Sequence, residues 1–152
     1  MNNLQWSEEY AVGIESIDRE HRVLFDLYNE LRGSILRGES RSMTAAKLEM
    51  LGEFTEKHFG DEEQLMAESG YPRLEEHRAL HQQLSRQVQE MQERFRDTGN
   101  ILTVDALGFI YESLNEHTLR DDRAYFTWAQ QLVDAEALRS QKKYVDSDVC
   151  SR

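Results

Sequence analysis

Apolar residues recur along four segments of the chain at alternating intervals of three and four positions. The stripe of the first segment, residues 18–37 with the position just before them, is Ile17, His21, Leu24, Tyr28, Leu31 and Ile35. Comparable stripes run through residues 44–69, 72–97 and 103–132. Such a period is typical of amphipathic helices, and the alternation of three and four favours packing at shallow angles. The pattern therefore predicts four long helices.

Short breaks that contain glycine separate the four segments. Gly38 is expected to end the first helix, and Asp18 or Ser16 to cap its start. Pro72 suits the first turn of the third helix. Because short connections make successive helices antiparallel, we predict an all-α fold, an up-down-up-down four-helix bundle.

Length and polarity suggest how the chain is divided around this bundle. The 152 residues suffice for one domain with a buried core, which we assign to residues 1–134. Residues 1–16 precede the first helix and are expected to form an N-terminal arm lying across the bundle. Residues 135–152 are mostly polar and predict a short C-terminal extension or tail. Cys150, the lone cysteine, lies in that tail and has no partner for an internal disulfide.

The chain is strongly acidic, with 29 Asp and Glu against 18 Lys and Arg and a formal charge of −11. Such a charge repels phosphate backbones and anionic lipid, so we expect neither nucleic acid nor a membrane as partner. At the start of the chain we find no basic region followed by an apolar stretch, the pattern of a secretory signal. We also find no run of about 18 apolar residues, the length that a membrane-spanning helix needs. We therefore expect a cytoplasmic protein, a monomer or weak oligomer, with no protein partner indicated.

All five histidines of the chain fall on the apolar stripes. They are His21, His58, His77, His81 and His117. Histidine is usually intermediate in burial, so five core positions are not expected by chance. Unpaired imidazoles in a bundle core, together with the Glu62 carboxylate on the same stripe, would each cost several kcal/mol. A metal centre between them would satisfy all of these groups.

Spacing places these residues in one layer. His58 and Glu62 are four positions apart, as are His77 and His81, so each pair shares a helix face. His58 and His117 each lie 14 residues after the start of their segment, and His21 and His81 each lie 16 before the end of theirs. In an antiparallel bundle these positions have the same depth at ~1.5 Å per residue.

The ligand types restrict the metal. Imidazole and carboxylate without thiolate suit iron, zinc, manganese or copper, and five histidines exceed the needs of one tetrahedral zinc. Two ions bridged by carboxylates would use every histidine, with Glu62 as one bridge. The second bridge is open at this point. Asp121 lies four residues after His117 and has the better helical geometry, whereas Asp122, at five, lies about 140° round and would need a bulge to point inward.

These residues resemble the hemerythrin family, and within it the stand-alone bacteriohemerythrins. The resemblance covers roughly residues 4–132 and is carried by five motifs. They are Gly13-Ile14-x-x-Ile17-Asp18-x-x-His21-x-x-Leu24-Phe25, His58-Phe59-x-x-Glu62-Glu63-x-x-Met66, Gly70-Tyr71-Pro72, His77-x-x-x-His81 and His117-x-x-x-x-Asp122-x-x-Tyr125. The family has its aspartate five residues after the last histidine, so the resemblance favours Asp122 over Asp121.

The resemblance implies a non-haem centre of two iron ions bridged by an oxo or hydroxo group and by two carboxylates. Its ligands would be His21, His58, Glu62, His77, His81, His117 and Asp122. The first iron would take the last three histidines, and the second would take the first two and keep one open position. The implied function is reversible binding of dioxygen by a carrier, store or supplier rather than by an enzyme. The alternatives are an oxygen or redox sensor, or a di-iron enzyme that handles peroxide, nitric oxide or iron.

The chain departs from the family pattern at two positions near the expected ligand pocket. Ser113 stands where the family often has Trp, and Thr118 where it usually has Ile. A hydroxyl there can hold a water that delivers a proton. We expect these two residues to shorten the lifetime of the oxygenated protein.

Overall fold

The computed structural model describes residues 2–97 and 104–149, and their regular secondary structure is entirely helical. The elements are a short 3-10 turn η1 (Glu8–Tyr10), α1 (Glu15–Leu36), α2 (Arg41–Ser69), α3 (Leu74–Asp97), α4 (Val104–Glu116), a π-helical segment η2 (His117–Asp122) and α5 (Arg123–Val149). The predicted all-α class is confirmed.

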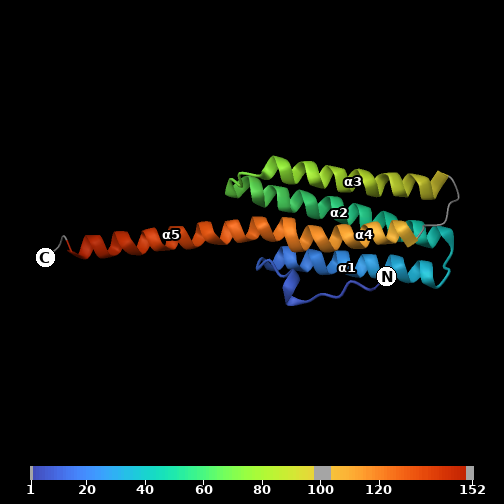
Figure 1. The fold of residues 1–152 in the computed structure, drawn as a ribbon, viewed down its shortest axis with the longest axis horizontal. Coiled ribbons are helices and arrows are strands. Elements are labelled where there is room, and N and C mark those ends of the chain that lie inside the picture. Colours follow the sequence, from blue (N-terminus) through green and yellow to red (C-terminus); the bar gives the residue numbers. More distant parts are fainter. Residues whose placement is uncertain (1, 98–103, 150–152) are drawn as a thin grey trace.

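The first four α-helices pack side by side as an antiparallel bundle (Figure 1). Helix α1 contacts α2 and α4, and α3 contacts the same two helices, so each member has two neighbours. This arrangement confirms the predicted up-down-up-down bundle. Segments η2 and α5 continue α4 without a break, so the fourth helix of the bundle is built from three elements.

The helix ends confirm one predicted signal and contradict others. Gly38 ends α1 with a φ of 63°, and its amide donates to the Ile35 carbonyl at 3.1 Å. The prediction that Asp18 or Ser16 caps this helix is wrong, because α1 already begins at Glu15. The Asp18 carboxylate instead accepts from the Val12 amide at 2.8 Å and so holds the preceding segment. Pro72 also lies before its helix, since α3 begins at Leu74.

The arm lies across the bundle as predicted. The Asn29 side chain on α1 accepts from the Leu4 amide at 3.0 Å and donates to the Leu4 carbonyl at 2.8 Å. Closer in sequence to the start of α1, the Tyr10 hydroxyl donates to the side-chain oxygen Oδ1 of Asn115 at 2.6 Å. Between these anchors, the ring centroid of Trp6 lies 6.5 Å from that of His21. The arm therefore covers the layer in which the histidines were predicted.

Two apolar clusters lie on either side of that layer. The larger one is Leu4, Leu24, Phe25, Tyr28, Leu31, Leu48, Leu51, Phe95, Leu107 and Ile110. The smaller one is Ile17, Met66, Tyr71, Tyr125 and Phe126. On every helix that contributes to both clusters, the predicted ligands fall between the two in sequence. Polar side chains in the layer are therefore shielded from water at both ends.

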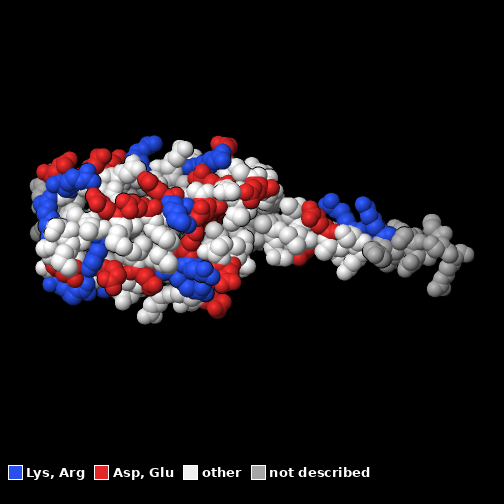
Figure 2. Space-filling model, turned by 180° about the vertical axis from the view of Figure 1, so that it is seen from behind, with Lys and Arg blue, Asp and Glu red and all other residues white. Residues whose placement is uncertain are grey.

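Helix α5 projects well beyond the bundle (Figure 1). Leu132, Val133 and Leu138 on this projection are exposed. Figure 2 shows acidic and basic side chains spread over the visible face of the bundle, with basic groups on the projection as well. In the described part of the chain, we find no helix with the length and apolarity that spanning a membrane requires.

Candidate metal centre

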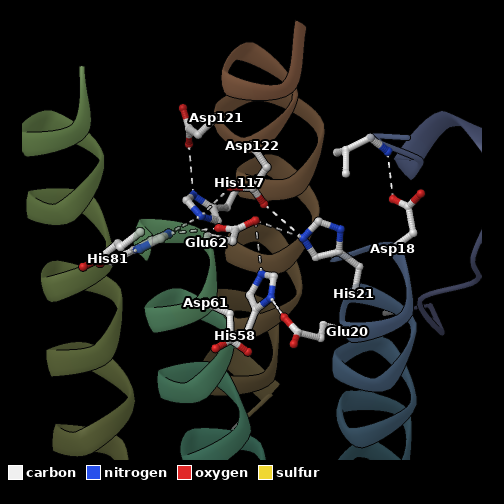
Figure 3. A network of polar contacts seen from close by, with 12 residues as sticks. Asp18, Glu20, His21, His58, Asp61, Glu62, His81, His117, Asp121 and Asp122 are labelled. Atoms are coloured by element: carbon white, nitrogen blue, oxygen red, sulfur yellow. Dashed lines mark hydrogen bonds and ion pairs between the residues drawn. The ribbon is translucent and has the colours of Figure 1, made fainter. Parts of the chain in front are cut away.

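The seven residues predicted as ligands meet in one buried layer of the bundle. Figure 3 labels all of them except His77. His21, Glu62 and Asp122 are fully buried, and even the most exposed members, His77 and His117, have only 6% of their surface exposed. Helix α1 supplies one histidine, α2 supplies His58 and Glu62, α3 supplies two histidines, and η2 supplies the remaining two residues. The common depth inferred from residue counting is therefore observed.

The donor atoms divide into two overlapping groups. The first consists of Glu62, His77, His81, His117 and Asp122, and the second of His21, His58, Glu62 and Asp122. Within each group, one donor atom from every residue lies within 4.8 Å of all the others. Because both carboxylates belong to both groups, the arrangement can hold two cations side by side with two shared ligands.

The π-helical segment decides which aspartate faces the centre. A π-turn closes i to i+5, so His117 and Asp122 project to the same side, as residues four apart do in an α-helix. One Asp122 oxygen lies 3.0 Å from His117 Nε2, and the other lies 3.2 Å from His21 Nε2. Asp121 points to the outer side, where its carboxylate lies 3.3 Å from His117 Nδ1. This is the bulge that an inward Asp122 requires.

Several buried atoms of the centre approach one another without forming hydrogen bonds. His77 Nε2 lies 3.3 Å from Asp122 Oδ1, yet neither atom has a hydrogen-bond partner in the described part of the chain. The same holds for both Glu62 oxygens and for His21 Nε2. Buried polar atoms rarely stay unpaired, because each lost partner costs about 1–3 kcal/mol. These unpaired atoms lie around one small volume, as expected if metal ions bind between them.

Three further carboxylates orient histidine rings from outside the centre. Glu20 lies 2.8 Å from His58 Nδ1, Glu63 lies 2.9 Å from His81 Nδ1, and Asp121 takes the same role at His117. Such contacts fix the ring tautomer and raise the basicity of the other nitrogen. Sequence reasoning missed Glu20 and Glu63. The acidic doublets Glu62-Glu63 and Asp121-Asp122 could have indicated a second carboxylate beside each predicted ligand. Glu20 contacts a histidine on a different helix, and no local pattern in the sequence indicates that contact.

A small apolar cavity adjoins the centre. Its volume is about 30 Å³, and both His58 and His117 line it together with Leu24, Phe59, Leu114 and other apolar residues. Three hydroxyl side chains also line it, those of Thr55, Ser113 and Thr118. Thr118 lies in the π-helical segment, and its side chain is buried, with 3% of its surface exposed.

Comparison with known proteins agrees with this geometry. A family model described as the hemerythrin HHE cation binding domain matches residues 12–129, more than three quarters of the chain. The chain belongs to the hemerythrin family. The predicted resemblance is thereby confirmed, and all seven residues of the buried cluster lie within the matched range.

Relatives and solved structures of hemerythrins match over most of the chain. Bacteriohemerythrin from Pseudomonas aeruginosa (strain LESB58) is 30% identical over 125 residues, which cover 82% of this chain and 80% of that protein. Bacteriohemerythrin from Clostridium acetobutylicum is 30% identical over 124 residues, covering 79% and 96%. A crystal structure of wild-type hemerythrin superposes with a TM-score of 0.78 at 25% identity, covering 83% of this chain and 97% of that one.

Proton affinities within the hemerythrin cluster are strongly shifted. Burial lowers the pKa of His21, but contacts with Asp122 and Glu62 outweigh it and raise the pKa to about 9. At His117 burial again lowers the pKa, while Asp122 and Asp121 raise it to about 10. Burial raises the pKa of Asp122, yet the surrounding histidines hold it well below its usual range. The cluster thus favours cationic partners for its two inner carboxylates.

These shifts predict how the protein stripped of metal responds to pH. Raised histidine pKa values stabilise the folded state fully below about pH 6.5, and this contribution is lost as the pH rises towards 9–10. We expect the free energy of unfolding of chelator-treated protein to fall between pH 6.5 and pH 9, as measured by urea unfolding. The variant His21→Gln should show a shallower fall. Equal or greater stability at pH 9 would contradict this assignment of charge.

Proposed function

We propose that this protein binds dioxygen reversibly at a non-haem di-iron centre. The observation that carries the proposal is the pair of overlapping donor groups that share Glu62 and Asp122. Imidazole and carboxylate donors without thiolate suit iron, and a shared carboxylate pair suits two ions rather than one. His77, His81 and His117 would hold one iron and His21 and His58 the other, with Glu62 and Asp122 bridging.

The two donor groups differ in size, and this supports ligand binding at one iron. Five residues surround the first position and four the second. Two ferrous ions held by these residues would supply the electrons that dioxygen accepts on binding and returns on release. The apolar cavity is lined by His58 from the smaller group and by His117 from the larger one, so it adjoins both positions. The position with fewer protein donors is the one with room for a diatomic ligand.

The size of the cavity supports binding rather than turnover. A water molecule needs about 10–15 Å³ of such volume, so a cavity of about 30 Å³ accommodates one or two small molecules and no organic substrate. Leu24, Phe59 and Leu114 present apolar surface to it and disfavour water. We accordingly propose a carrier, store or supplier of oxygen that acts in the cytoplasm, and not an enzyme.

The proposal is tested by cycling the iron-loaded protein between anaerobic reduction and air. We expect about two irons per chain, no haem, and a visible absorption that appears in air and disappears again when oxygen is removed. Binding of a single zinc ion per chain would contradict the proposal. So would an oxidation of the iron in air that is not reversed when oxygen is removed under argon. Steady consumption of peroxide or nitric oxide would favour an enzyme instead.

The hydroxyls of Ser113 and Thr118 should shorten the lifetime of the oxygenated protein. Both side chains line the cavity, where each hydroxyl can hold a water that delivers a proton. We expect the double variant Ser113→Ala, Thr118→Val to lose its oxygenated absorption about fivefold more slowly, as for a barrier raised by ~1 kcal/mol. An indole at position 113, although common in the family, would overfill a cavity of about 30 Å³.

Thr55 provides the matched control for this measurement. It lines the same cavity, but its hydroxyl already donates to the Leu51 carbonyl at 2.7 Å. Thr55→Val should therefore leave the decay rate unchanged at the same pH. Unchanged or faster decay in the double variant would show that the two hydroxyls do not control the cavity.

A further inference from the structure

A second hollow, on another side of the centre, is polar. It lies between the start of α3 and the junction of η2 with α5 and has a volume of about 80 Å³. Arg73, Glu76, His77, Asp121 and Ala124 are among its lining residues. Unlike the apolar cavity, it has charged side chains in its walls.

The polar side chains of this pocket follow one another from the surface to the centre. The Glu76 side chain is 67% exposed, that of Asp121 is 21% exposed, and that of His77 is only 5% exposed. His77 Nε2 lies 3.3 Å from Asp122 Oδ1 and has no hydrogen-bond partner among residues 2–97 and 104–149. The pocket therefore ends at the His77 side chain, whose Nε2 faces the two inner carboxylates of the centre.

An ion pair spans the outer end of the pocket. Arg73 donates to one Glu76 oxygen from two nitrogens, at 2.9 and 2.7 Å. Both side chains are about two-thirds exposed, so this pair is weak and can open. When it opens, the Glu76 carboxylate is free to attract a cation, and Asp121 is the next negative group inward.

We propose that this pocket is the route by which divalent metal ions reach the centre, with Arg73 and Glu76 as its gate. This rests on the proposed iron centre, but it assigns a separate task to residues outside that centre. The apolar cavity is a poor alternative, because a hydrated divalent ion is costly to bring against apolar walls. A groove between α2 and α3 reaches His81. There the Phe59 ring stacks on the His81 ring, with 3.8 Å between the ring centroids, and covers it.

The test measures the rate at which the metal-free protein takes up cobalt(II) alone, followed by the absorption of the bound ion. Glu76→Gln should slow uptake about threefold at low salt, and Arg73→Ala should accelerate it by a similar factor. Ala124→Phe, which fills the pocket without changing charge, should slow uptake about tenfold or more. All three variants should reach the stoichiometry of the unmodified protein, because none alters a proposed ligand.

Two controls separate this route from general effects. Glu56→Gln removes a charge from the groove beside Phe59, and Gln131→Phe adds a ring to the exposed projection of α5. Neither should change the rate. Unchanged rates in Glu76→Gln and Arg73→Ala, or slowing in Glu56→Gln instead, would overturn the route. Failure of the unmodified protein to bind cobalt(II) would overturn the metal centre itself, and is a different result.

Discussion

Asp122→Asn is expected to abolish the binding of two irons per chain, whereas Asp121→Asn should leave that stoichiometry intact. Asp122 is fully buried and belongs to both donor groups, so its loss removes one shared carboxylate from both metal positions. Asp121 contacts only the outer nitrogen of His117. Losing an outer contact of this kind typically weakens metal affinity about 10- to 100-fold.

The adjacent pair is its own control, since both variants remove one negative charge from the same turn. Anaerobic titration with ferrous iron, read by metal analysis after gel filtration, gives stoichiometry and affinity, and circular dichroism verifies that the helices persist. The opposite pattern, with Asp121 essential and Asp122 dispensable, would show that an ordinary α-helical spacing operates and that the π-turn does not set the ligands.

Removal of metal is expected to lower the melting temperature substantially. In the described part of the chain the buried oxygens of Glu62 and Asp122 and the Nε2 atoms of His21 and His77 have no hydrogen-bond partner, so the protein without metal must hydrate or protonate them. A ligand at a thousand times its dissociation constant stabilises the folded state by about 4 kcal/mol. For a chain of this size that corresponds to roughly 8–16 °C.

Thermal unfolding of chelated and iron-reconstituted protein, monitored at one pH, measures this difference. Asp122→Asn serves as the control, because its melting temperature should respond little to added iron. Equal melting temperatures for the two forms of the unmodified protein would mean that the polar layer is satisfied without metal, which would remove the main physical argument for the centre.

The sequence by itself determined the bundle and the histidine layer. A spacing of three and four residues can bury only one face of a helix, so Leu24, Tyr28 and Leu31 had to face the same core as His21. Equal distances from the segment ends then placed His58 and His117 at one depth, because the helical rise per residue is constant. The buried face of a helix and the depth of a residue along it depend only on residue spacing, so both can be predicted from the sequence.

Only the tertiary structure decided how that layer is completed. Helical spacing alone favoured Asp121 and only the family resemblance pointed to Asp122, whereas the π-helical segment gives the geometry that turns Asp122 inward. Glu20 on α1 acts on His58 of α2, and Thr118 is buried within the same π-helical segment. Asp18 likewise binds the arm rather than capping α1. Each depends on which atoms of different segments come within hydrogen-bond distance, a non-local property that periodicity along one helix does not encode.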